Sequence, residues 1–183
     1  FYRVEYPDGR QGFISQDEAQ KLSKWRVQVG HDAASILRTA HSMMGIPYMW
    51  GGTSPKGVDC SGFVRTVLYL HDIIIPRNAS QQAKVGKRIQ PQDDYADLQP
   101  GDLLFFGSKN QDGSPKRVVH VGISLGGCRF IHSLGYVHTG SFNPLDADYD
   151  EYERNRFLFA ARILPYVNQD TQILTTDNIS LYQ

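Results

Sequence analysis

The sequence predicts a globular α+β protein, because hydrophobic patterns typical of helices fill its first half and patterns typical of antiparallel strands come after them. Two amphipathic helices are expected at 33–44 and 60–71. Four strands are expected later, at 102–107, 117–125, 128–134 and 156–164. With 183 residues, of which 40% are hydrophobic and 21% charged, the chain is long enough to bury a core between these layers.

The first 15 residues are expected to form a β-hairpin. Apolar and polar side chains alternate from Tyr2 to Tyr6, the letters PDGR supply a turn, and Phe13 lies on the return strand. A lone hairpin is only marginally stable in water, so we expect it to end a larger β domain or to pack on the next segment of the chain. Residues 16–30 are predicted to be a linker with Trp25 as its anchor.

The first helix is expected to begin after Asp32, whose carboxylate can accept a hydrogen bond from a free N–H of the first turn. Gly45 and Pro47 end it. A glycine-rich loop at 48–59 leads to the second helix, and the letters PRNASQQAKVG describe a loop that enters a short helix. The apolar stripes of the two long helices are formed by Ile36, Leu37, Ala40, Met43 and Met44, and by Phe63, Val64, Val67, Leu68 and His71.

The strand at 117–125 has two different faces. One face is uniformly apolar, whereas His120 shares the other face with small residues that leave room above the strand. The apolar face carries Val119, Val121, Ile123 and Leu125, and the small residues are Gly122 and Ser124. After Pro165 the chain is polar, and residues 166–183 are expected to be a tail that wraps the surface.

Composition narrows the classes of function. Lys and Arg together number 19, as do Asp and Glu, so the formal net charge is zero and gives no support for binding to nucleic acid or anionic membranes. The chain has no run of about 18 apolar residues, so no membrane span is expected. The two cysteines, Cys60 and Cys128, are too few for a disulfide scaffold, although a single disulfide between them is one interpretation. We expect a monomer.

Cys60 occupies an unusual place for a packing residue, at the front edge of the second helix. A helix N-terminus carries unpaired N–H groups and partial positive charge, which stabilise a thiolate and favour a nucleophile. Asp59 or Ser61 could cap this helix. The alternative is that Cys60 is a small buried hydrophobic residue that happens to lie at a helix end.

A reactive cysteine needs a base, and His120 and His132 are the candidates. If the turn has the three residues Leu125 to Gly127, so that residue 124 pairs with residue 128, then His120 faces His132 on one side of the hairpin. One histidine would then orient the other, as in a catalytic triad. The other four histidines, His138 in a predicted loop among them, are expected to have surface or packing roles.

A metal site is the competing interpretation of the same residues. Cys60, His120 and His132 are all of types that bind zinc in other proteins, but only Asp59 is available as a fourth ligand. We therefore expect neither a metal nor another cofactor.

Five motifs occur in order along the chain, and together they carry a family resemblance. They are PYMWGGTSPKGVDCSGFV, PRNASQQ, LQPGDLLFF, VVHVGISLG and FIHS. The chain resembles the NlpC-type family of bacterial cell-wall cysteine peptidases over residues 31–165. This resemblance implies a circularly permuted papain-like fold, with N-terminal helices packed on an antiparallel sheet.

The resemblance also implies a role for each candidate site residue, through the motif that contains it. It implies that Cys60 is the nucleophile, His120 the base and His132 the residue that orients the base. Tyr48 would help to hold the oxyanion, and Asp59 would bind the substrate ammonium near Ser61. Trp50, Arg77 and Ser80 would shape the substrate pocket. Helix capping for Asp59, capping of the next short helix for Ser80, and core packing for Tyr48 and Trp50 stay open as alternatives.

The hairpin at 1–15 resembles the end of a bacterial SH3 domain. With a catalytic domain at 31–165, this combination resembles the γ-D-glutamyl-L-diamino acid endopeptidases. The resemblance implies hydrolysis of peptidoglycan stem peptides with a free N-terminal L-Ala, and a location in the bacterial cell envelope or periplasm. An amidase or acyltransferase on the same scaffold, or a non-catalytic wall-binding module, are the alternatives.

Overall fold

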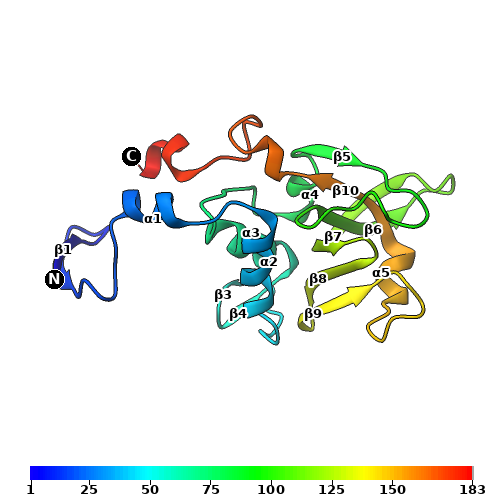
Figure 1. Ribbon diagram of the computed structural model, residues 1–183, viewed down its shortest axis with the longest axis horizontal. Coiled ribbons are helices and arrows are strands. Elements are labelled where there is room, and N and C mark those ends of the chain that lie inside the picture. Colours follow the sequence, from blue (N-terminus) through cyan, green and yellow to red (C-terminus); the bar gives the residue numbers. More distant parts are fainter. Residues whose placement is uncertain (183) are drawn as a thin grey trace.

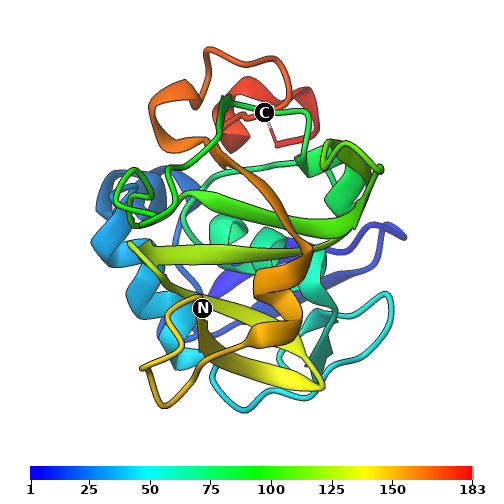
Figure 2. The same cartoon turned by 90° about the vertical axis from the view of Figure 1, so that its right-hand side faces the viewer.

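A six-stranded antiparallel sheet forms the centre of the computed structural model, which describes residues 1–182 (Figures 1 and 2). Its strand order is β5 (Lys87–Ile89), β10 (Phe157–Arg162), β6 (Leu103–Lys109), β7 (Pro115–Gly126), β8 (Arg129–Leu134) and β9 (Tyr136–Ser141). The helices α2 (Ala33–Ser42), α3 (Cys60–Tyr69) and α4 (Ala79–Gln82) precede these strands in the chain. This arrangement confirms the predicted α+β class.

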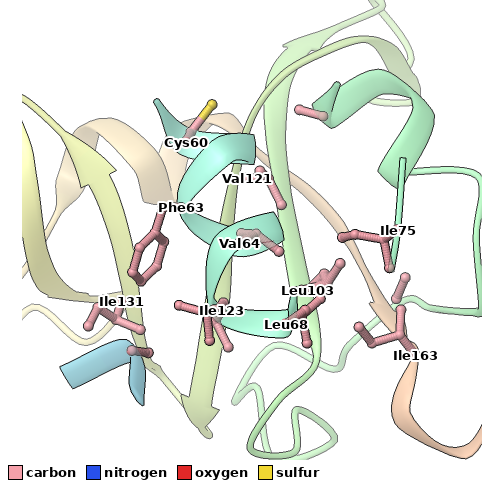
Figure 3. Packing of buried hydrophobic residues seen from close by; sticks show 14 of the residues in the cluster. Cys60, Phe63, Val64, Leu68, Ile75, Leu103, Val121, Ile123, Ile131 and Ile163 are labelled. Atoms are coloured by element: carbon pink, nitrogen blue, oxygen red, sulfur yellow. The ribbon is translucent and has the colours of Figure 1, made fainter. Parts of the chain in front are cut away.

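Helix α3 covers one face of the sheet and forms the main core with it (Figure 3). Phe63, Val64 and Leu68 on the helix pack toward Val121 and Ile123 on β7. Each of these side chains is no more than 1% exposed. Because full burial of one such side chain contributes about 1.5–3 kcal/mol, this contact fixes the position of Cys60 at the start of the helix.

A second, aromatic core lies on the opposite face of the sheet. Phe106 on β6 and Phe130 on β8 belong to it, together with Phe142 and Phe157. The short helix α5 (Glu151–Arg156) contacts β6. Successive residues of β6 belong to the two cores in turn, because successive side chains of a strand point to opposite faces of the sheet.

The predicted helix caps are present. Asp32 accepts a hydrogen bond from the backbone N–H of Ser35, and α2 begins at the next residue. Asp59 accepts one from Gly62 at 2.7 Å, and α3 begins at Cys60. The caps thus set the first residue of each long helix.

The predicted register between β7 and β8 is wrong by two residues. Gly122, rather than His120, lies opposite His132. The turn is formed by Gly127 and Cys128 rather than by residues 125–127, because Gly126 pairs with Arg129, and a bulge between Ser124 and Gly126 then takes up one residue. A shift of two residues keeps each side chain on its face, so the two histidines become diagonal neighbours.

The strands β5 and β9 and the helix α5 were not predicted from the sequence, and three further segments contain more structure than expected. The expected linker at 16–30 holds a helix, α1 (Leu22–Gln28), and Arg26 in it donates to the Thr176 hydroxyl at 2.8 Å. The expected loop at 48–59 contains two short paired strands, β3 (Thr53–Ser54) and β4 (Gly57–Val58). The expected surface tail bridges to residue 74 and buries Ile173 completely, with short 3-10 helices at Leu164–Tyr166, Thr176–Asn178 and Ser180–Tyr182.

The predicted hairpin forms from β1 (Tyr2–Glu5) and β2 (Gln11–Ile14) and lies at one end of the molecule (Figure 1). Its assignment to a bacterial SH3 domain, like the domain boundaries, stays a prediction. The disulfide interpretation is wrong, because Cys60 and Cys128 are both free thiols. Within residues 1–182, none of the helices is long and apolar enough to span a membrane.

Candidate active site

Seven of the predicted site residues line one cavity of about 500 Å³. They are Tyr48, Trp50, Asp59, Cys60, Ser61, Arg77 and Ser80. The residues come from the glycine-rich loop, the start of α3 and the start of α4, and Arg117 to Val119 of β7 complete the lining. Segments far apart in the sequence therefore meet around the Cys60 thiol.

Cys60 is the first residue of α3, and it is only 7% exposed (Figure 3). Burial raises the pKa of the thiol, and the nearby Asp59 carboxylate raises it further. Backbone N–H groups of Val121, Ser61 and Cys60 itself work in the opposite direction by hydrogen bonding to the sulfur. The helix N-terminus thus supplies donors at the sulfur, but the resting thiol keeps its proton.

The glycine-rich loop lies directly against the first turn of α3. A Cβ atom at Gly62 would come within 2.0 Å of the Gly52 carbonyl oxygen, and one at Gly52 would come within 2.4 Å of the Gly57 carbonyl oxygen. Gly51 has φ +77°, a conformation that favours glycine. The glycines are required here because the backbone of the loop packs on the helix that carries Cys60.

His120 and His132 form a buried, hydrogen-bonded pair. Nε2 of His120 lies 2.9 Å from Nδ1 of His132, and the two residues are 5% and 0% exposed. Within residues 1–182, Nδ1 of His120 has no hydrogen-bond partner. If Nε2 carries the proton that is shared with His132, Nδ1 is the nitrogen that can accept another proton.

The resting thiol and imidazole are both neutral. Burial lowers the pKa of His120 to about 3 and that of His132 to about 2, while burial raises the pKa of Cys60. Val121 joins the two groups, since its N–H bonds to the Cys60 sulfur and it is the next residue after His120 on β7. No direct hydrogen bond connects Cys60 with His120 in the described part of the chain. Such contacts commonly tighten when substrate binds.

The buried histidines make stability depend on pH. The folded protein keeps both imidazoles neutral, whereas the unfolded chain protonates them below their ordinary pKa of 6.5. The stability of the folded protein that depends on these two neutral imidazoles is therefore fully present above that pH. It is lost as the pH falls from there toward the lowered pKa values. We expect His132→Asn to reduce the slope of unfolding free energy against pH by about 1.4 kcal/mol per pH unit in this window.

Urea unfolding of both proteins across that window checks this prediction. Glu153 has a raised pKa and acts in the opposite direction, but it is present in both proteins and cancels in the comparison. If unfolding free energy changed with pH at the same slope in the wild type and in His132→Asn, burial would not be holding His132 neutral.

Asp59 is both a helix cap and the partner of an arginine. Arg77 donates to its two carboxylate oxygens at 3.0 and 2.6 Å, and backbone N–H groups of Gly51 and Gly62 donate as well. Burial opposes ionisation of Asp59, but these hydrogen bonds outweigh it and lower its pKa. Ser61 donates to the same carboxylate at 3.2 Å. The acid is therefore ionised and held rigidly at the cavity wall.

The remaining predicted residues differ in exposure. Tyr48 is half-buried, and burial raises the pKa of its hydroxyl, so the hydroxyl stays a donor. Trp50 is 88% exposed, which overturns core packing as its role, and it lines the cavity. Ser80 is exposed and lies inside α4, whose N-cap is Asn78, so Ser80 does not cap that helix.

Three further polar groups surround the histidine pair, and sequence reasoning missed all of them. His138 lies on β9 rather than in a loop, and its ring centroid is 4.4 Å from that of His132. Glu153 on α5 is fully buried, and Asp150 caps that helix by accepting from the Glu153 N–H. An acidic N-cap residue followed by Glu at the third helical position is typical of a helix start, and Asp150 and Glu153 have this arrangement. This is the sequence signal that could have predicted α5.

His120, His132 and Glu153 place one potential ligand atom each within 4.8 Å of one another. However, the two imidazoles bond directly through Nε2 and Nδ1, so a proton occupies the space between the lone pairs that a metal ion would need. Asp59, the fourth ligand considered from the sequence, is engaged by Arg77. The donor set therefore fits a hydrogen-bonded base better than a metal centre.

An antiparallel sheet with a buried histidine pair, packed against a helix that begins at a cysteine beside a cavity, is the arrangement of papain-like cysteine peptidase domains. The chain belongs to the NlpC/P60 family, whose pattern matches residues 45–157.

Similar proteins support this assignment. The chain is 40% identical over 121 residues to a γ-D-glutamyl-L-lysine dipeptidyl-peptidase of Bacillus subtilis, and 34% identical over 132 residues to one of Bacillus cereus. These matches cover 66% and 72% of this chain but only 37% and 38% of the relatives. The chain thus spans less than half the length of both curated relatives.

Solved structures show the same fold. An NlpC/P60 family protein from Bacillus cereus superposes with a TM-score of 0.70 at 29% identity, covering 90% of this chain and 50% of the other. The NlpC/P60 domain of the peptidoglycan hydrolase SagA gives a TM-score of 0.57 at 32% identity, covering 72% of this chain and 99% of that domain. The papain-like expectation from the sequence is therefore confirmed.

Proposed function

We propose that this protein is a cysteine peptidase that hydrolyses the γ-D-glutamyl-L-diamino acid bond of peptidoglycan stem peptides. The observation that carries the proposal is the position of Cys60, at the N-terminus of α3 and in the wall of a cavity. His120 and His132 are not in the lining of this cavity, but Val119, which precedes His120 on β7, is. The names of the relatives support the substrate class, because two of them are γ-D-glutamyl-L-lysine dipeptidyl-peptidases.

The proposed reaction begins with attack of the Cys60 sulfur on the γ-carbonyl carbon of D-Glu. His120 takes the thiol proton at Nδ1, while its Nε2–H stays bonded to His132. The backbone N–H of Cys60 and the Tyr48 hydroxyl donate to the oxyanion. His120 then protonates the leaving amine, and water activated by the same nitrogen hydrolyses the thioester.

We propose that Asp59 also recognises the free N-terminal amine of L-Ala. Its ionised carboxylate lies in the cavity wall, and an ammonium group would find there a fixed partner that an acylated amine would not. Arg77 already neutralises part of this charge. The amine would therefore share Asp59 with Arg77 rather than form an isolated ion pair.

The Asp59→Asn substitution tests this recognition. Asn keeps an oxygen for capping α3 but removes the negative charge. We expect kcat/KM to fall about 10- to 100-fold for a stem peptide with a free amine, because one charged pair is lost, and to change little for the N-acetylated peptide. Equal losses on both peptides, measured by product chromatography, would remove the proposed role.

The bond specificity is tested with two isomeric peptides, L-Ala-γ-D-Glu-L-Lys and its α-linked counterpart. Mass spectrometry is expected to find L-Ala-D-Glu and Lys from the γ-linked peptide alone. Products joined to an added amine acceptor would identify an acyltransferase instead. A γ-linked peptide that stays intact would contradict the proposed function.

A further inference from the structure

Glu153 is a buried acid that the proposed mechanism does not use. Its side chain is 0% exposed, and it lies on α5 beside the aromatic core. Oε1 lies 3.9 Å from Nε2 of His120 and 3.1 Å from a guanidinium nitrogen of Arg156. Oε2 has no hydrogen-bond partner among the described residues. Burial of an incompletely bonded carboxylate is costly, so its position calls for an explanation.

The histidine pair supplies a reason for an acid at this place. When His120 accepts the thiol proton, its ring becomes a cation in a site from which water is excluded. Such a cation is strongly disfavoured unless an opposite charge lies close by. His132 cannot provide it, because that ring is neutral, and its own Nε2 lacks a hydrogen-bond partner within residues 1–182.

We propose that Glu153 is a positioning residue that stabilises the imidazolium form of His120 during attack by Cys60, and that Arg156 tunes this effect. The proposal rests on the proposed function. The proton moves from the Cys60 sulfur to Nδ1 of His120, so the thiolate and the imidazolium form together and the total charge is unchanged. Glu153 carries no proton in this step. Its carboxylate faces Nε2, the opposite nitrogen of the same ring.

The charged groups around His120 determine whether protonation of its ring is favoured or opposed. Cys60 begins α3, His132 belongs to β8 and His138 to β9. Asp150, next to α5, lies 3.8 Å from Nε2 of His132, and Arg156 lies at the other end of the helix. The positive charges of Arg156 and a protonated His138 oppose protonation of His120. The carboxylates of Glu153 and Asp150 favour it.

Glu153 also predicts a specific pH dependence. Burial raises its pKa to about 7, while Arg156 lowers it and Asp150 raises it. The stabilising charge is therefore complete only above about pH 7. We expect the alkylation rate of Cys60 and kcat/KM to rise through this pH in the wild-type protein, in step with ionisation of Glu153.

The test compares Glu153→Gln with Arg156→Gln, using Glu151→Gln on the exposed side of the same helix as the matched control. Iodoacetamide alkylation is followed from about pH 5 to about pH 9, on both sides of the Glu153 pKa, with Cys60 and Cys128 separated by peptide mass. Glu153→Gln is expected to lose the rise near pH 7 and to react about tenfold more slowly above it. Arg156→Gln is expected to move the rise to higher pH without lowering the plateau.

If Glu153 served only to hold Arg156, the Glu153→Gln and Arg156→Gln variants would show the same dependence of Cys60 alkylation on pH. That result would overturn the inference. Circular dichroism shows whether Glu153→Gln folds. If it does not, the Arg156→Gln profile decides, since an unmoved rise contradicts the proposal. A wild-type Cys60 that reacts no faster than Cys128 at any pH would instead count against the proposed function.

Discussion

Replacement of Cys60 by alanine is expected to abolish hydrolysis of stem peptides, with a loss in kcat of at least about 10⁴-fold. The sulfur is the atom that forms the thioester in the proposed mechanism, and no second thiol lies near the cavity, because Cys128 is not among the residues that line it. The substitution removes only the sulfur from a residue that is 7% exposed, so folding should survive with a modest loss of stability. Product formation measured by chromatography checks the result.

Cys128→Ala is the matched control for this experiment. Cys128 is a free, partly exposed thiol just before β8, and its sulfur contacts only the Asp94 carbonyl oxygen by hydrogen bonding, at 3.7 Å, among the described residues. Activity is expected to stay at the wild-type level. Full activity of Cys60→Ala, or a comparable loss in Cys128→Ala, would be incompatible with Cys60 as the nucleophile.

The second large effect is expected for His120→Ala, which removes the proposed base. We expect kcat to fall about 10³- to 10⁴-fold, because the thiol, whose pKa is raised by burial, then has no group to accept its proton. Added imidazole should restore part of the activity, because it can enter the space left by the side chain. Alkylation of Cys60 should shift to higher pH in the same variant.

His41→Ala serves as the control for loss of an imidazole. His41 is exposed on α2, where its ring bonds to the Leu37 carbonyl oxygen, and it lies outside the cavity. Its substitution should leave kcat unchanged. If His120→Ala retained more than a tenth of wild-type activity without imidazole, His120 would not be the base.

Much of the fold could be predicted because local signals agreed with one another. Asp32 and Asp59 mark helix starts, and the apolar stripes behind them match the buried faces of α2 and α3, except that Met44 lies beyond the end of α2 and is 45% exposed. The strands β6, β8 and β10 showed the expected apolar patterns, and so did β7 from Val121 onward. Val119, expected on the apolar face of β7, is instead 44% exposed, because a bulge between the pairs at 120 and 118 leaves it out of register. Pro165, by contrast, was a misleading signal, since the polar tail after it buries Ile173. Burial of single residues in an irregular segment leaves no periodic pattern.

The site was predictable where its residues are neighbours in the chain. Cys60 and Asp59 are adjacent in sequence, and the cap geometry of α3 fixes them together. The turn and the bulge that together set the register of His120 against His132 have no clear sequence pattern, and the two rings stayed close only because a shift of two residues keeps them on the same face. Glu153 reaches the site through tertiary packing of a six-residue helix, which periodicity cannot reveal in so short a segment.

The most direct test of the central claim is a covalent trap made from the proposed substrate. L-Ala-γ-D-Glu with a diazomethyl ketone in place of the scissile amide would take the thiol proton at its diazo carbon and lose N₂ as the sulfur bonds to that carbon. Mass spectrometry is predicted to find one adduct, on the peptide that contains Cys60, and none in the Cys60→Ala variant. The absence of an adduct, or its appearance on Cys128, would contradict a cysteine peptidase with Cys60 as its nucleophile.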